Sequence, residues 1–181
     1  AKEEGMTVVV TDHHDIPFEE TESGKQYLKS NADAIVNPHQ EECQYPYKEL
    51  CGAAVAWKFV QALYEKNQVA SDRADEFLEN VAFATIGDVM DLTGENRLIV
   101  RLGLERLHHT KNLGMRALIF QNNLTMEQIK AYHIGFILGP CMNASGRLDT
   151  AKRSLQLLLA ETEREASECA SDLIALNTSR K

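Results

Sequence analysis

The stretch MTVVVTDHH, residues 6–14, predicts a strand that is followed directly by a polar triplet. Its first six residues form an unbroken run rich in β-branched side chains, which is typical of a parallel strand buried on both faces. In open parallel sheets, ligands bind beyond the carboxyl ends of the strands. Asp12, His13 and His14 follow this strand directly, so they are candidate site residues.

The two neighbouring histidines suit different tasks. Successive residues of an extended segment point to opposite sides, so His13 and His14 cannot both ligate one ion unless the chain turns there. The sequence therefore favours one histidine for a metal ion and the other for a substrate. A turn that carries two solvated histidines is the alternative, and the triplet alone does not exclude it.

The rest of the chain changes from strands to helices. Ala34–Val36 is a second short strand, and the polar stretches before it and over residues 39–47 are predicted to be loops. From Glu49 onward, apolar residues recur at helical spacing. The fold class is therefore α/β, with short parallel strands followed by a mostly helical region; two strands alone make a poor sheet. Helices are predicted over residues 49–64, 74–92, 96–108, a short segment after Thr125, 149–159 and 162–177.

Asp88 is a second candidate site residue. On the predicted helix 74–92, Phe77, Val81 and Ala84 have the spacing of a buried face. Asp88 is the next position on that face, and a buried unpaired carboxylate is costly. A metal ion, a cation or a hydrogen-bond network is therefore expected as its partner. A structural, hydrogen-bonded aspartate is the alternative.

The segment GPCMNASGR, residues 139–147, is a third candidate. Its proline, two glycines and small residues predict a fixed loop that presents Arg147. Asp149 and Thr150 follow as helix-starting residues, so backbone amides are expected to point toward the same place. A guanidinium beside a helix N-terminus is a good phosphate clamp. An arginine paired with an acidic surface is the alternative.

Composition narrows the class of protein without deciding it. With 27 acidic and 19 basic residues the net charge is −8, whereas proteins that grip nucleic acid tend to be basic. An acidic phosphoesterase is compatible with this charge, because bound metal ions reverse it locally. No apolar run approaches the roughly 18 residues of a membrane span. The four cysteines form no CxxC pair, so neither a zinc site nor a disulfide framework is expected, and the thiols fit a cytoplasmic protein.

Taken together, three segments resemble the RecJ exonucleases of the DHH phosphoesterase superfamily. The resemblance covers essentially all 181 residues in order and is more specific than the triplet alone. A fourth RecJ-like stretch runs from Ile35 to Lys58. The three segments are TDHHDIP (11–17), ATIGDVMDLTGENR (84–97) and GPCMNASGRLDTA (139–151).

The resemblance implies a site that holds two divalent cations, Mn²⁺ or Mg²⁺. His13 and Asp88 would be metal ligands, and Asp12 and His14 the catalytic residues, with Asp12 supporting the site and His14 facing the scissile phosphate. The residues that would contact the substrate are Arg147, Asn143, Ser145 and Gly146.

The activity that this resemblance implies is metal-dependent 5′-to-3′ hydrolysis of single-stranded DNA to 5′-mononucleotides in DNA repair and recombination. Expected partners are single-stranded DNA and repair proteins such as single-strand-binding protein, with no membrane; the sequence predicts no oligomeric state. One alternative is another DHH phosphoesterase, such as an oligoribonuclease or a pyrophosphatase. A non-catalytic DHH scaffold is the other.

The resemblance also implies a domain organisation. Residues 1–148 are expected to be the C-terminal part of a DHH catalytic domain, whose first two motifs would precede Ala1. Residues 149–181 are expected to be a helical extension that leads toward a further domain after Lys181. The 181-residue chain is therefore expected to be nearly inactive by itself.

Overall fold

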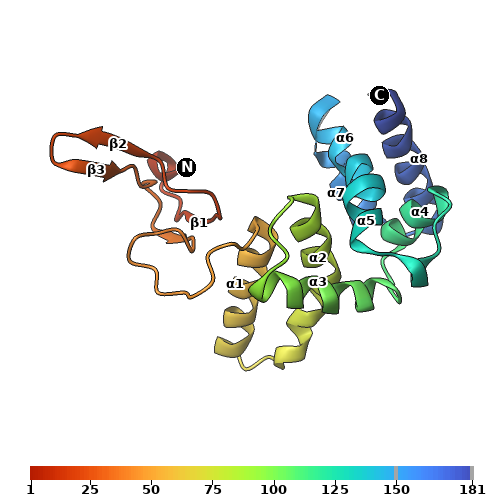
Figure 1. Ribbon diagram of the computed structural model, residues 1–181, viewed down its shortest axis with the longest axis horizontal. Coiled ribbons are helices and arrows are strands. Elements are labelled where there is room, and N and C mark those ends of the chain that lie inside the picture. The colour runs from red at the N-terminus through yellow and green to blue at the C-terminus, as the bar shows by residue number, and fades with distance from the viewer. Residues whose placement is uncertain (149–150, 180–181) are drawn as a thin grey trace.

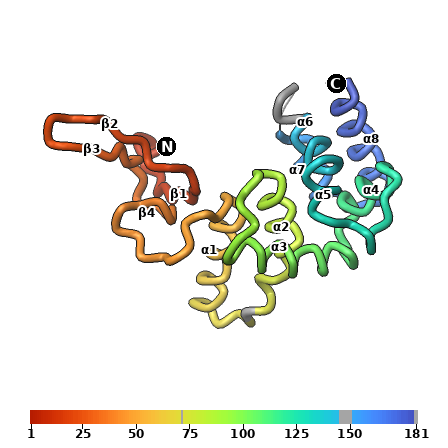
Figure 2. The backbone as a smooth tube through the Cα atoms, in the orientation of Figure 1, coloured from red at the N-terminus to blue at the C-terminus, as the bar shows by residue number. Residues whose placement is uncertain are grey.

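The computed structural model describes residues 1–148 and 151–179, and for Ser71 and residues 145–148 it describes the backbone only. The strands lie at one end of the molecule, the helices α1–α3 in the middle and the helices α4–α8 at the other end (Figure 1; Figure 2). The predicted α/β class, with short parallel strands before a mostly helical region, is confirmed. No helix among the described residues is long and apolar enough to cross a membrane.

The two predicted strands pair as expected. β1 (Val9–Thr11) lies parallel to β4 (Ala34–Val36), with Val10 opposite Ile35. The expectation that β1 is buried on both faces is wrong, because Val9 is 52% exposed. Among the described elements only β4 pairs with β1, so the sheet has two strands and its faces stay largely open.

A hairpin occupies the stretch that was predicted to be a loop. β2 (Phe18–Thr21) and β3 (Gly24–Tyr27) are antiparallel, and every residue in them is exposed. Phe18 and Tyr27 form a cross-strand pair with ring centroids 6.0 Å apart, which is a stabilising contact in such a ladder. The prediction failed because neither strand has a buried face, so no apolar alternation marks it in the sequence.

Helices and helical turns make up the rest of the chain. α1, α3 and α8 lie close to their predicted ranges, whereas α4 was not predicted. The helical elements are η1 (Lys2–Glu4), α1 (Gly52–Lys66), η2 (Ser71–Phe77), α2 (Leu78–Gly87), α3 (Gly94–Leu107), α4 (Leu113–Gln121), η3 (Met126–Gln128), α5 (Ala131–His133), the π-helical turn η4 (Ile134–Leu138), α6 (Gly139–Leu148), α7 (Lys152–Leu158) and α8 (Glu163–Ser179).

The helix predicted over residues 74–92 ends early. α2 stops at Gly87, because the amides of Val89 and Met90 turn back to the carbonyls of Ile86 and Thr85 in a Schellman motif. Val89 has φ 58°, a left-handed conformation that a β-branched residue rarely adopts. The prediction that Asp88 points inward on a continuous buried face is therefore wrong, and its side chain is 51% exposed.

Residues 139–147, predicted to be a fixed loop, are helical. α6 continues directly from η4, where the amide of Gly139 bonds to the carbonyl of Ile134, five residues back. Pro140 has no amide donor and normally interrupts a helix, but here it follows a turn in which the α-helical ladder is already interrupted. Cys141 and Ala144 are buried, so these small residues let α6 pack against α8.

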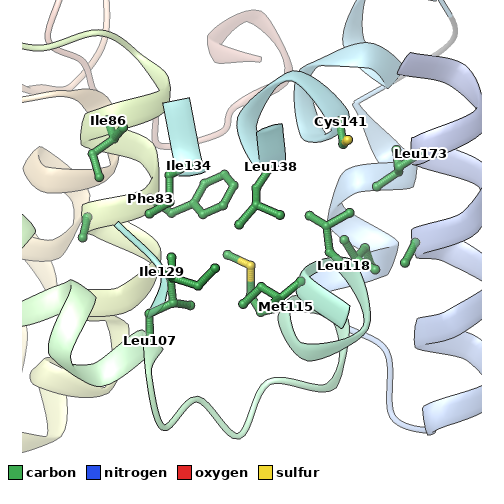
Figure 3. Packing of buried hydrophobic residues seen from close by; sticks show 14 of the residues in the cluster. Phe83, Ile86, Leu107, Met115, Leu118, Ile129, Ile134, Leu138, Cys141 and Leu173 are labelled. Carbon is green, nitrogen blue, oxygen red and sulfur yellow. The ribbon is translucent and has the colours of Figure 1, made fainter. Parts of the chain in front are cut away.

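The helices share two neighbouring clusters of buried side chains. One cluster lies among α1, η2, α2 and α3, where the indole of Trp57 donates a hydrogen bond of 2.8 Å to the carbonyl of Ala74. The other joins α2 and α3 to the elements from α4 to α8, with Phe83, Leu118 and Leu138 at its centre (Figure 3). Because α2 contributes to both, its C-terminal end at Gly87 is held in a fixed place.

Candidate metal centre

Asp12 organises the loop that follows β1. One carboxylate oxygen, Oδ1, accepts hydrogen bonds from the amides of His13, at 2.8 Å, and His14, at 3.4 Å, and it lies 2.8 Å from the His14 ring nitrogen Nδ1. The hydrogen bond with His14 and the two amides lower the pKa of Asp12, and the same carboxylate raises the pKa of His14. Asp12 therefore fixes how both histidines are presented.

His13 and Asp88 come together across 75 positions of sequence. Their side-chain atoms Nε2 and Oδ2 are 3.5 Å apart, which confirms the predicted proximity. Two ligands that each lie about 2.1 Å from one ion are roughly 3.0–3.5 Å apart. The spacing of this nitrogen and this oxygen therefore fits the chelation of a single divalent cation.

The end of α2 positions Asp88 for this contact. Because the helix terminates in the Schellman motif, Asp88 is its C-terminal cap residue. Its carboxylate turns away from the core and toward the loop of Asp12, His13 and His14, which we name the DHH loop. The left-handed Val89 that completes the motif is 87% exposed. Backbone strain of this kind persists only where the surroundings enforce it, and it is frequent at functional sites.

The described residues supply only part of a metal cage. Within residues 1–148 and 151–179 there is no group of three or more His, Cys, Asp or Glu side chains placed to hold an ion. The rings of His13 and His14 are 4.3 Å apart, but His14 is turned toward Asp12. His13 and Asp88 thus form a pair of candidate ligands, which is consistent with one histidine for metal and the other for substrate.

The N-terminus of α1 faces the same pair. A Cβ atom added at Gly52 would lie 3.3 Å from the His13 ring, so the helix begins against this imidazole. Cys51, the N-cap residue, makes no capping hydrogen bond through its side chain. The first amides of a helix have no partner within it and carry partial positive charge. This helix start can therefore receive a phosphate oxygen beside His13.

Two residues of the site were missed in the sequence. Asn37, 3% exposed, donates to the carbonyl of His14 at 2.9 Å and accepts from the amide of His39 at 2.8 Å. The ring of His39 lies 3.1 Å from the carboxylate of Asp15, so both residues belong to the polar contacts around this loop. The position of Asn37 directly after β4 was a signal, because that strand ends at the same sheet edge as β1.

A cleft of about 700 Å³ connects this centre with α6. His13, Gly52 and Asp88 line one side, and Gly139 and Asn143 line the other. Of the four predicted substrate residues, Asn143 therefore lines the cleft that the candidate metal centre also lines. For Ser145, Gly146 and Arg147 the structure describes the backbone only, and Asp149 and Thr150 lie outside the described residues.

Comparison with known proteins bears on this geometry. Residues 1–85 match the DHH family, N-terminal domain. The RecJ single-stranded-DNA-specific exonuclease of Bacillus subtilis is 39% identical over all 181 residues. The chain is therefore similar to RecJ proteins along its whole length and to the DHH family over its first 85 residues. It covers 21% of the Bacillus subtilis relative, so it spans about a fifth of that protein's length.

Solved structures agree with this similarity and with the fold. The crystal structure of Thermus thermophilus RecJ in complex with Mn²⁺ matches 98% of this chain with a TM-score of 0.79 at 31% identity, and 25% of that protein is covered. The Mg²⁺ complex of the same RecJ matches 81% of the chain with a TM-score of 0.71 at 32% identity, and 23% of that protein is covered. The resemblance to RecJ proteins of the DHH family is therefore confirmed.

Proposed function

We propose that the protein containing this chain is a metal-dependent exonuclease that hydrolyses single-stranded DNA from the 5′ end to 5′-mononucleotides. The observation that carries the proposal is the 3.5 Å approach of His13 and Asp88, because it brings the DHH loop and the end of α2 to chelating distance. RecJ relatives, which match the whole chain, are named as single-stranded-DNA-specific exonucleases.

The proposed metal ligands of this chain are His13 and Asp88, and the proposed catalytic residues are Asp12 and His14. Two divalent ions, Mn²⁺ or Mg²⁺, would supply charge neutralisation at the scissile phosphate when bound. Asp12 orients His14 through the 2.8 Å contact, so that its other ring nitrogen can face that phosphate. We propose that the remaining metal ligands come from parts of the protein outside residues 1–181.

Substrate contacts are proposed on both walls of the cleft. The amides at the start of α1 would donate hydrogen bonds to one phosphate oxygen beside His13, and Asn143 would contact the same strand from α6. Arg147, Ser145 and Gly146 are proposed to extend this contact, as the resemblance implies. Hydrogen bonds from a guanidinium to phosphate are charge-assisted, so Arg147 would be the strongest of these contacts.

Several expectations about the whole protein stay predictions. They are the division between residues 1–148 and 149–181, the cytoplasmic location and an association with repair proteins such as single-strand-binding protein. α7 and α8 share one buried cluster with α4 and α6. A boundary after Leu148 would therefore separate helices that pack together, and a test of that boundary has to measure stability as well as activity.

The test uses the full-length protein that contains this chain, with a 5′-labelled single-stranded oligonucleotide and Mn²⁺. His13→Ala and Asp88→Ala should each lower the release of mononucleotides at least about 100-fold, because each removes a ligand. His109→Ala is the matched control, since this histidine is exposed at the end of α3, and it should leave the rate unchanged. Normal digestion by either site variant would contradict the proposal.

A further inference from the structure

Two exposed aromatic rings stand beside the cleft without a role in the metal centre. Tyr132 is 62% exposed and Phe136 is 71% exposed. Their ring centroids are 5.0 Å apart with planes inclined by 27°, so they form a stacked pair. The two residues are four positions apart on one helical run, which places their side chains as neighbours. We name Tyr132 and Phe136 the ring pair.

The ring pair is turned away from the core. Ile134 and Leu138, which flank Phe136 two positions on either side, are fully buried and point into the large cluster (Figure 3). Phe136 is the central residue of the π-helical turn η4, and such turns are frequent at functional sites. Both rings therefore lie on the outer surface by the geometry of the helix, and both residues stay more than half exposed within the stack.

The same helical run leads into the cleft. A Cβ atom added at Gly135 would lie 3.6 Å from Ile86, two residues before Asp88. Gly139, three residues after Phe136 and about 5 Å further along the helix axis, lines the cleft together with Asp88. The helical run that carries the ring pair thus reaches the wall of the cleft at Gly139.

Charge favours a polyanion on this surface. From Gln128 to Leu148 the sequence contains no Asp or Glu, although acidic residues make up 27 of the 181 in the chain. The same segment contains Lys130 and Arg147. In an acidic protein, a stretch without carboxylates that also presents stacked aromatic rings suits a ligand with phosphates and flat bases.

We propose that the ring pair is a stacking platform for bases of single-stranded DNA that enter or leave the cleft. This inference rests on the proposed function and adds the subsite that holds the strand next to the cleft. A base would continue the stack on an open ring face, and Lys130 lies close enough in sequence to attract the phosphates. Such stacking accepts every base, so it suits an enzyme without sequence preference.

The experiment measures binding by the full-length protein with a chelator present, so that no digestion occurs. Two fluorescent probes of equal length are used, an oligothymidylate and an abasic oligonucleotide that keeps the phosphates but lacks bases. In one variant, Tyr132→Leu with Phe136→Leu, apolar bulk is kept and the aromatic faces are lost. In another, Tyr132→Phe with Phe136→Tyr, both rings are kept. Phe120→Leu on α4 is the control, because this ring is 80% exposed and does not line the cleft.

The leucine pair should weaken oligothymidylate binding by about 5- to 150-fold for each stacked base that is lost, and leave abasic binding unchanged. The ring-preserving pair and Phe120→Leu should bind both probes as the parent does. Melting temperatures confirm that each variant is folded. If the double leucine variant is not folded, the single variant Phe136→Leu replaces it in the experiment.

Two results would overturn the proposal. If the leucine variant binds oligothymidylate like the parent, no base stacks there. If it loses the two probes equally, the surface contacts another part of the protein or the backbone of the strand. The proposed function fails separately, if the parent protein does not digest single-stranded DNA with Mn²⁺.

Discussion

The two ends of the chain are built very differently. Within residues 1–49 only Asn37 and Pro38 are buried, and both strand pairs have open faces. From Leu50 to Ser179 two clusters of buried side chains hold the helices together. The DHH triplet thus lies on the lightly packed end, while Asp88 and the start of α1 belong to the packed end. The candidate metal centre forms where the two meet.

On the strand side, the geometry of the candidate metal centre therefore depends on a few polar contacts and not on a packed hydrophobic core. Asp12 fixes the two histidines and Asn37 ties the loop to β4. Lys2 and the amide of Val8 hold Asp33, whose pKa they lower, so the approach to β1 is also pinned by polar groups. Loss of one such contact should disturb the centre and leave the helices intact.

The largest expected effect is on the packed end. Leu118 is fully buried in α4, so Leu118→Ala should lower the free energy of unfolding by about 2–5 kcal/mol. Val9→Ala in β1, where the side chain is half exposed, should change it by no more than about 0.5 kcal/mol. Urea denaturation followed by circular dichroism measures both. Equal losses would show that the strands are as firmly packed as the helices.

Removal of the buried side-chain amide of Asn37 should destabilise only the lightly packed end. In Asn37→Ala, the carbonyl of His14 and the amide of His39 lose their partners, at a local cost of about 1–3 kcal/mol. Hydrogen exchange at the His39 amide should become faster, while exchange in α2 and α4 stays slow. Asn67→Ala, which removes an exposed bond to the carbonyl of Leu63, is the control. Faster exchange throughout the helices would break the contrast.

Relief of strain beside Asp88 should stabilise the packed end slightly. Glycine adopts the left-handed conformation of Val89 without a Cβ clash, so Val89→Gly should add about 1 kcal/mol of stability. A higher melting temperature with unchanged circular dichroism is the expected result. A lower one would mean that Val89 makes a stabilising contact that outweighs its backbone strain.

The smallest expected effect depends on pH. Burial raises the pKa of Glu79, against a hydrogen bond of 2.6 Å from the Thr110 hydroxyl that lowers it. Because the folded-state pKa exceeds the unfolded one, the carboxyl favours folding at low pH and this contribution is lost as the pH rises. Glu79→Gln should therefore stabilise the protein at pH 7 by on the order of 0.5 kcal/mol, and by less at pH 4. A gain that grows toward low pH would contradict this.

The elements that could be predicted from the sequence are those with a regular apolar pattern. The strand β1 and the helix α8 were predictable, because their apolar patterns are regular, and the triplet was a candidate site because it directly follows a strand. The hairpin was missed since no face of it is buried, and the turn at Asp88 was missed because a Schellman motif with valine at its left-handed position carries no glycine to mark it. The sequence predicts a loop over residues 139–147, because proline and glycine disfavour a helix. The packing of Cys141 and Ala144, which stabilises the helix there, is visible only in the structure.

The proximity of His13 and Asp88 could be predicted from the sequence only through its resemblance to a family. Helical periodicity placed Asp88 on a buried face, which was wrong, whereas the resemblance placed it at the metal centre. The early end of α2 explains the difference between these two predictions. Because the helix stops at Gly87, the Asp88 carboxylate lies outside the core and points toward the DHH loop.

The most direct test of the shared metal centre is Mn²⁺ affinity, measured by titration calorimetry on the full-length protein in a double-mutant cycle. If both residues hold the same ion, as proposed, His13→Ala and Asp88→Ala should each weaken binding at least about 10-fold, and the double variant should bind scarcely more weakly than either single one. Strictly additive losses, or unchanged affinity in either single variant, would contradict a shared ion between the two ends of the chain.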